Sequence, residues 1–155
     1  MGMKPTTLDQ QDELALKNLI KSFKTAYQGK HDHVFWLSVD LRFVMRASSI
    51  HHLKAQAFSL ALLKAFKEAI GDTNSVLVSA FNFTFPQNKV FDLGKTLVQT
   101  GAFGNFLIQN HPRHRMTHPF YSFCVFGPAE NELLDTHFVN GTGENSIFEC
   151  LSTIM

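Results

Sequence analysis

Apolar residues recur at helical spacing in two long stretches of the chain. Residues 7–27 open with Thr7 and Gln10, whose types and spacing predict a capping box, and continue with an apolar stripe opposite a row of lysines. This stripe can dock on the same domain or on another subunit. Residues 52–71 carry leucine, alanine and phenylalanine around most of the helix circumference and end at Gly71, so we expect a helix that is covered on more than one side. Less regular helical patterns are expected in three further segments: 96–109, 128–137 and 145–155.

Short apolar runs that are rich in aromatic and β-branched residues predict three buried strands: 33–41, 75–83 and 121–127. Their alternation with helices predicts an α/β fold, a three-layer domain with a central, largely parallel sheet. The expected organisation is an N-terminal amphipathic helix over residues 1–30 and an α/β domain over residues 31–155. Ligands of such sheets bind beyond the carboxyl ends of the strands, so the loops after Asp40, Phe83 and Phe126 are candidates for a site.

Composition narrows the class of protein. The chain has 155 residues, of which 45% are apolar and 17% charged, as in a folded globular domain. The formal net charge of +1 gives no reason to expect a nucleic-acid partner. No stretch has the pattern of a signal peptide or the length of a membrane span, so we expect a cytoplasmic protein with no membrane partner. Two cysteines are too few for a disulfide framework, and Cys124 lies in an apolar pattern typical of an inert, buried thiol.

The stretch "HPRHRMTHPFYSF" (111–123) concentrates the polar chemistry of the chain. Its three histidines have a spacing compatible with a metal ion, but neighbouring prolines and arginines oppose this interpretation, and no cysteine or carboxylate completes a zinc site. Arg115 with a histidine before a buried strand forms a donor cluster suited to phosphate or carboxylate. A solvated loop that leads into the strand explains the same residues, so the residue types alone leave both interpretations open.

Four stretches stand out by their order along the chain: "FWLSVDLRFV" (35–44), "ALLKAFKEAIGDTNSVLVSAFNFTF" (61–85), "RMTHPFYSFCVFG" (115–127) and "GTGENSIFECL" (141–151). In this order they resemble the aminoglycoside 3-N-acetyltransferase family, the antibiotic N-acetyltransferases that use acetyl-coenzyme A. The third stretch is the most specific, because it is similar to the family's Arg-Ser-x-His-Pro-x-x-Ser motif and keeps the spacing of its arginine, histidine, proline and serine.

The resemblance implies a coenzyme pocket and a reaction. Its residues for binding acetyl-CoA would be Ser38, Asp40, Thr84, Arg115, His118 and Ser122. The reaction would be acetyl transfer from the thioester to an amine, with a general base that takes the amine proton. The family's Asn-Thr-x-x-His-x-x-Glu motif, the expected source of the catalytic residues, lies downstream of the matched part and does not occur in this sequence. We therefore assign no catalytic residue and expect the N-terminal part of the family's domain, as a fragment, a truncation or a degenerate relative.

The leading hypothesis is an acetyl-CoA-dependent N-acetyltransferase, with a role in antibiotic resistance if its acceptor is an aminoglycoside. Another amino sugar, such as one from a surface polysaccharide, is the other acceptor that we consider. The alternative is a catalytically inactive coenzyme-binding or interaction protein, and a metal-dependent hydrolase is a remote third. The 16 phenylalanines need a packed interior or a partner surface, so an incomplete domain would associate with itself, as a homo-oligomer or an aggregate.

Overall fold

The computed structural model describes residues 8–27, 29–48, 50, 54–83, 85–88, 90–99, 101–116, 118, 120–135, 144, 146, 148–149 and 152. The chain divides into two compact units, and both are discontinuous in sequence. The first contains Met1–Lys30 and Val39–Asp72, and the second contains His31–Ser38 and Thr73–Met155. The first unit therefore includes helices that follow the first strand, in addition to the N-terminal helix.

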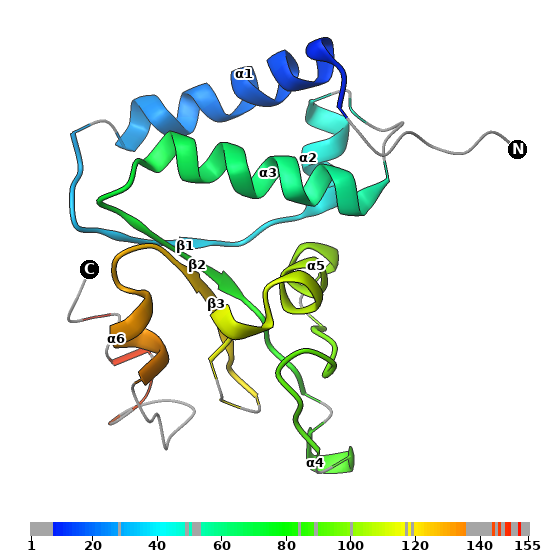
Figure 1. Ribbon diagram of the computed structural model, residues 1–155, viewed down its shortest axis with the longest axis vertical. Helices are drawn as coiled ribbons and strands as arrows, with labels where there is room; N and C mark the ends of the chain where they lie inside the picture. The colour runs from blue at the N-terminus through cyan, green and yellow to red at the C-terminus, as the bar shows by residue number, and fades with distance from the viewer. Residues whose placement is uncertain are drawn as a thin grey trace, which may run out of the picture. The chain divides into compact units, whose positions relative to one another are not determined.

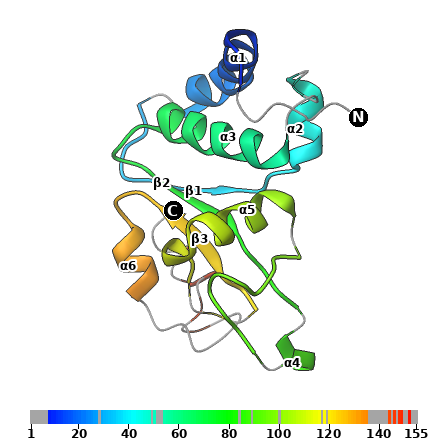
Figure 2. The ribbon, with the colours of Figure 1, turned by 45° about the vertical axis from the view of Figure 1, so that its right-hand side comes forward.

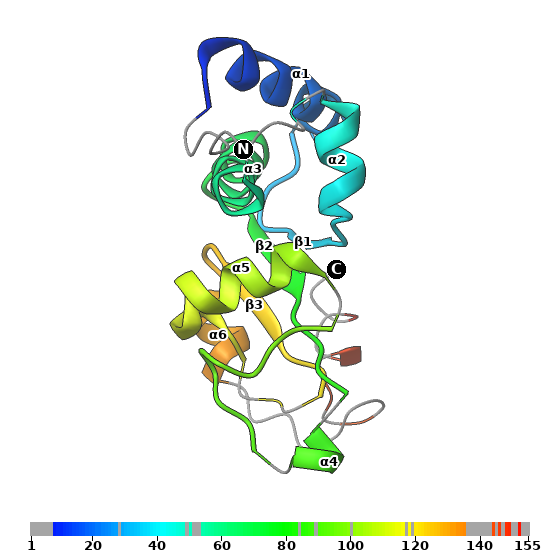
Figure 3. The same cartoon turned by 90° about the vertical axis from the view of Figure 1, so that its right-hand side faces the viewer.

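The first unit is helical and contains α1 (Gln10–Tyr27), α2 (Leu41–Ala47) and α3 (Ala55–Ile70). Both α1 and α2 lie beside α3 (Figures 1 and 3). Thr7 lies outside the described residues, so its predicted capping box stays a prediction. Among the described residues, two aspartates form a reciprocal cap at the start of α1. The Asp12 amide donates to Asp9 Oδ1 over 2.8 Å, and the Asp9 amide donates to Asp12 Oδ2 over 3.2 Å.

α2 was not predicted, because the apolar run at 33–41 is typical of a single strand. The strand ends at Leu37, and Asp40 starts the helix as its N-cap, with its carboxylate accepting from the Phe43 amide over 3.0 Å. The prediction for the second long helix is confirmed over most of its length, since α3 ends at Ile70 and Gly71 follows with a φ of 79°. Residues 51–53 lie outside the described residues.

The second unit contains a three-stranded sheet in the order β1 (Val34–Leu37), β2 (Ser75–Ser79) and β3 (Phe123–Phe126). β1 and β2 are parallel, but β2 and β3 are antiparallel, so the sheet is mixed. The expectation of a largely parallel sheet is therefore wrong for β3. Ser79 at the carboxyl end of β2 pairs with Phe123 at the start of β3, which means that the connecting segment re-enters the sheet at that end without crossing back.

Helices lie on the two sides of this sheet (Figures 1 and 2). α6 (Glu130–Asp135) contributes Leu133 to a core with Val34, Leu77 and Val125. On the other side lies α5 (Ala102–Asn110), which starts later than the helix predicted at 96–109 because the preceding residues form a turn. The described elements also include α4 (Phe85–Asn88) and the 3₁₀ turn η1 (Pro112–His114).

Candidate functional site

Arg115 is the most deeply buried charged side chain of the predicted site, with only 2% of its surface exposed. Its guanidinium donates Nη1 to the carbonyls of Leu93 and Thr96, over 3.1 and 2.8 Å, and Nη2 to the carbonyl of Ala80 over 3.1 Å. Nε donates to Ser122 Oγ over 3.0 Å. We call Arg115, Ser122 and these three carbonyl groups the arginine hub. Because its described hydrogen bonds all go to the protein, Arg115 connects three segments that are distant in sequence.

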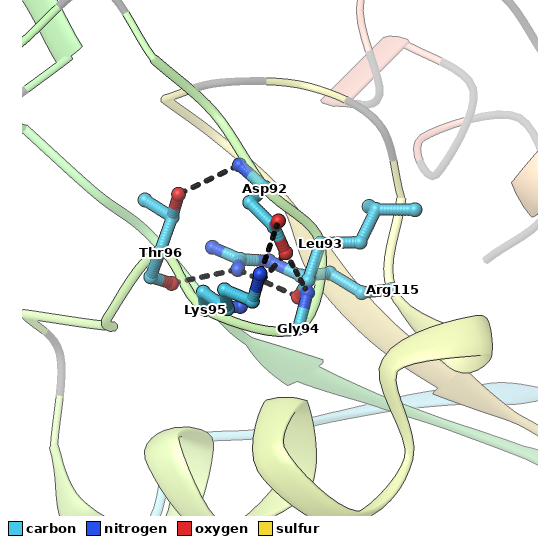
Figure 4. Close-up of polar contacts among 6 residues, drawn as sticks. All are labelled: Asp92, Leu93, Gly94, Lys95, Thr96 and Arg115. Carbon is cyan, nitrogen blue, oxygen red and sulfur yellow. Dashed lines mark hydrogen bonds and ion pairs between the residues drawn. The ribbon is translucent and has the colours of Figure 1, made fainter.

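The turn at residues 92–96 is shaped to present its carbonyls to Arg115 (Figure 4). Asp92 accepts at Oδ1 from the amides of Gly94 and Lys95, and its own amide donates to Thr96 Oγ1 over 2.8 Å. An aspartate two residues before a glycine is a known signal for such a side-chain-closed turn. The sequence therefore held a signal for this turn, in the loop that leads to the helix predicted at 96–109.

Electrostatics and stacking complete the surroundings of Arg115. Its guanidinium carbon lies 4.7 Å from the centre of the Phe91 ring. Burial lowers the pKa of the Arg115 guanidinium, while Cys124 and Asp92 act in the opposite direction. Ser122 is fully buried and donates its hydroxyl to the Ala80 carbonyl over 2.7 Å. The hub thus joins the end of β2 to the segment that precedes β3.

His118 lies in the same loop but has a different environment. Its Nδ1 accepts hydrogen bonds from the amides of Phe120 and Tyr121, over 3.2 and 2.9 Å. A ring nitrogen that accepts two amide protons carries no proton itself, so the neutral ring has its proton on Nε2. Burial lowers the pKa of His118, which favours this neutral form. His118 is therefore a side chain that shapes the loop through one nitrogen and presents an N–H group through the other.

The remaining predicted residues lie outside the hub. Ser38 is exposed and follows β1, and Asp40 caps α2 in the first unit. Thr84 lies outside the described residues. The structure thus joins Arg115 and Ser122 in one hydrogen-bonded cluster, whereas a common pocket for all six residues stays a prediction.

The other two histidines of the 111–123 stretch pack against β3. The His114 ring stacks on Phe126, with the ring centres 4.6 Å apart, and His111 meets the same phenylalanine edge-on at 5.6 Å. His114 Nδ1 lies 2.9 Å from Glu130 Oε1, at the separation of an ion pair but without the alignment of a hydrogen bond. Within the part of the chain that the structure describes, no group of three or more His, Cys, Asp or Glu residues is arranged to hold a metal ion.

Cys124 is fully buried in β3, as its apolar surroundings in the sequence predicted. Burial raises the pKa of its thiol to about 12, although nearby Arg115 acts against this rise. A thiol with this pKa carries almost no thiolate at neutral pH, so Cys124 is a packing residue.

A surface groove of about 280 Å³ lies in the first unit and contains none of the predicted residues. Its walls come from α1 and α3 and include Lys17, Lys21, Lys24 and Glu68. These are the lysines that the sequence places opposite the apolar stripe of the N-terminal helix.

Every helix in the described ranges is too short or too polar to cross a lipid bilayer.

Comparison with known proteins identifies the family. The family model described as aminoglycoside 3-N-acetyltransferase matches residues 45–154, which is well over half of the chain. The chain belongs to the aminoglycoside 3-N-acetyltransferase family. The resemblance in the sequence is thereby confirmed: the stretches at 61–85, 115–127 and 141–151 lie inside the match, and the stretch at 35–44 precedes it. A search of the curated proteins with the sequence of this chain found no match.

Solved structures share the fold of this family member at low sequence identity. YokD from Bacillus subtilis is 17% identical with a TM-score of 0.60, over 86% of this chain and 57% of that chain. Sisomicin-bound AAC-VIa is 19% identical with a TM-score of 0.60, over 86% of this chain and 53% of that chain. The aminoglycoside acetyltransferase AAC(3)-Xa is 17% identical with a TM-score of 0.58, over 94% of this chain and 59% of that chain. The chain thus spans less than two thirds of the length of each.

Proposed function

We propose that the chain acts as an N-acetyltransferase, which transfers an acetyl group from acetyl-CoA to an amino group of an aminoglycoside or another amino sugar. The observation that carries the proposal is the family match over residues 45–154, which contains the turn with Arg115, His118 and Ser122. The fold shared with AAC-VIa, whose structure holds sisomicin, supports an amino-sugar acceptor. The cytoplasmic location stays a prediction from the sequence.

Within this proposal, the residues of the turn divide into two roles. His118 contacts the coenzyme directly, because its Nδ1 is used by the loop and its Nε2 is left to donate. Arg115 and Ser122 are positioning residues, because their hydrogen bonds are made inside the protein. Ser38, Asp40 and Thr84 stay as predicted coenzyme contacts. A direct ionic contact between Arg115 and a coenzyme phosphate does not fit a guanidinium that is 2% exposed.

In the transfer step, the amine nitrogen attacks the acetyl carbonyl carbon. A C–N bond forms, the thioester C–S bond breaks, and the amine gives up a proton to a base. Coenzyme A leaves as a thiolate, which takes up a proton to become the thiol. Negative charge develops on the carbonyl oxygen, and an N–H donor aimed at that oxygen lowers the barrier. His118 Nε2 is a described group of the turn with a proton to offer for this purpose. The base is assigned to no residue.

An acetylation assay tests the proposal. The protein is incubated with acetyl-CoA and a panel of acceptors that includes sisomicin and simple amino sugars, and the release of coenzyme A thiol and of acetylated product is followed. Turnover with at least one amine and none with a matched neutral sugar is the expected result. Acetyl-CoA binding without turnover across the panel would refute the enzymatic proposal and support the inactive, coenzyme-binding alternative.

The role of His118 has its own test. His118→Phe removes the Nε2–H donor, so we expect the affinity for acetyl-CoA to fall about fivefold, the value of one hydrogen bond of about 1 kcal/mol. Calorimetric titration measures the affinity. His111→Phe is the matched control, because His111 packs against Phe126 and is not part of this contact. Equal affinities of the two variants would remove His118 from the coenzyme site.

A further inference from the structure

The second unit carries a cluster of aromatic rings that the proposed chemistry leaves unused. Six rings contact one another, largely edge to face, with centre-to-centre distances of 5.0 to 6.3 Å. We call them the aromatic face: Trp36, Phe81, Phe83, Tyr121, Phe123 and Phe148. Phe123 is fully buried at the base of the cluster, whereas 45% of Trp36 and 50% of Phe83 are exposed. Large apolar side chains that remain this exposed beside a packed core are typical of a binding surface.

Trp36 is exposed but held in one orientation. Its indole N–H donates to Ser79 Oγ on the neighbouring strand over 2.8 Å. Its ring also meets Phe123 at 5.5 Å and Phe148 at 6.0 Å. A ring that is fixed before a ligand arrives loses little conformational entropy on binding. These contacts make Trp36 a prearranged surface, in contrast to a mobile side chain.

Trp36 and Phe83, the exposed rings of the aromatic face, are available to a cation from outside the chain. Among the described residues, no arginine or lysine lies over any ring of the aromatic face. Arg115 of the hub stacks on Phe91, which is not part of this face. His118 packs beside Tyr121, with the ring centres 5.7 Å apart. Because its Nδ1 is occupied by two amides, the group that His118 offers at this edge of the face is Nε2–H. The aromatic face therefore lies beside the group that the proposed function assigns to the coenzyme.

We propose that a protonated amino sugar binds on the aromatic face, with an ammonium group over Trp36. Tryptophan gives the strongest attraction between a ring and a cation. In this arrangement, aromatic side chains bind the ammonium groups of a polycationic sugar, in place of carboxylates. The inference rests on the proposed function, because it places the acceptor of the proposed reaction.

The test uses the fact that Trp36 is the only tryptophan of the chain. Its fluorescence is recorded while sisomicin is added at constant ionic strength, and sucrose serves as the uncharged control. A saturable change in emission with sisomicin and none with sucrose is the expected result. Phe83→Ser should weaken sisomicin about two- to fivefold, the contribution of one exposed cation–ring contact. Phe43→Ser removes an exposed phenylalanine outside the aromatic face and should leave the affinity unchanged.

Calorimetry tests Trp36 itself. Trp36→Leu should weaken sisomicin about fivefold or more, and Trp36→Phe should restore part of the affinity because it keeps a ring. Circular dichroism establishes that each variant is folded. Equal sisomicin affinities of the parent and the leucine variant would overturn the inference, as would an absence of binding. An emission change that follows protein concentration without any ligand would also overturn it, because a second copy of the chain would then cover the face.

Measuring acetyl transfer on the same samples separates the test of the aromatic face from the test of the proposed function. Acetylation of sisomicin with an affinity independent of Trp36 contradicts the aromatic face and leaves the enzyme proposal intact. Binding that depends on Trp36 without acetylation supports the aromatic face and refutes the enzyme proposal.

Discussion

At the scale of single residues, Arg115 illustrates how a buried charge is retained. Removal from water is costly for a guanidinium unless its donors are all matched. Here three backbone carbonyls and one hydroxyl accept from it, and the planar ring of Phe91 lies against it. Arg115 thereby satisfies carbonyl groups of a loop that has no regular secondary structure. Its position in the family-like motif is consistent with a role in shaping this loop.

Arg115→Met should lower the free energy of unfolding by about 3 kcal/mol, because several buried carbonyls would lose their donors at once. Urea denaturation measures the change. Arg113→Met is the matched control, since Arg113 lies on the exposed side of the same turn and should change stability by less than about 0.5 kcal/mol. Similar midpoints for the two variants would show that the hub contributes little to stability.

His118 should make stability depend on pH in a defined direction. Burial lowers its pKa in the folded protein, so the unfolded chain takes up the proton first as the pH falls below 6.5. The free energy of unfolding therefore decreases towards acid pH, and His118→Gln should reduce that decrease. Urea denaturation at several pH values checks this. A ¹⁵N NMR spectrum in which Nδ1, not Nε2, carries the proton would contradict the assigned tautomer.

At the scale of secondary-structure elements, the connection from β3 to α6 depends on Gly127. Its φ is 121°, and a Cβ at this position would lie 2.7 Å from the Asn74 carbonyl oxygen and 2.8 Å from the Ser75 Cα. The Ser75 hydroxyl also accepts from the Ala129 amide over 2.9 Å, which joins the start of β2 to the start of α6. The close approach of two backbones at this point requires a residue without a side chain.

Gly127→Ala should therefore destabilise the protein by about 3 kcal/mol or more, through backbone strain and overlap together. Gly71→Ala is the matched control, because Gly71 also has a positive φ of 79° but no atom lies within 4 Å of its would-be Cβ. Strain alone should cost about 1 to 2 kcal/mol there. Thermal or urea denaturation compares the two, and equal losses would show that overlap at Gly127 is relieved by movement of the backbone.

At the scale of the whole molecule, both compact units expose large apolar side chains. Outside the aromatic face, the first unit exposes Leu14, Phe43 and Leu60, and the second exposes Val90 and Leu97. Burying such side chains against another molecule is favourable by about 25 cal/mol for each Å² of apolar surface. The chain is therefore expected to associate with a partner surface or with itself.

We expect the purified chain to show concentration-dependent association in sedimentation velocity, with little dependence on salt, because apolar contacts are not screened. Replacing exposed apolar residues by serine, as in Leu60→Ser, should shift the distribution towards the monomer. Lys95→Ser, at an exposed polar position, is the control. A single monomeric species over the whole concentration range would contradict the expectation.

Local sequence patterns were sufficient to predict the long helices, the three strands, the inert thiol of Cys124 and the family. Helical spacing, β-branched and aromatic runs and the spacing of a motif are all properties of neighbouring residues, which is why they can be read along the chain. The exact ends of elements depended on caps, and the capping pair proved to be Asp9 and Asp12.

The tertiary structure alone decided the direction of β3 and the environment of Arg115. Both depend on contacts between distant residues: Ser79 pairs with Phe123, and Arg115 reaches carbonyls up to 35 residues away along the chain. A motif specifies that an arginine and a serine occur seven residues apart, but backbone carbonyls are present at every residue and leave no trace in the sequence. Only folding selects the three that accept from Arg115.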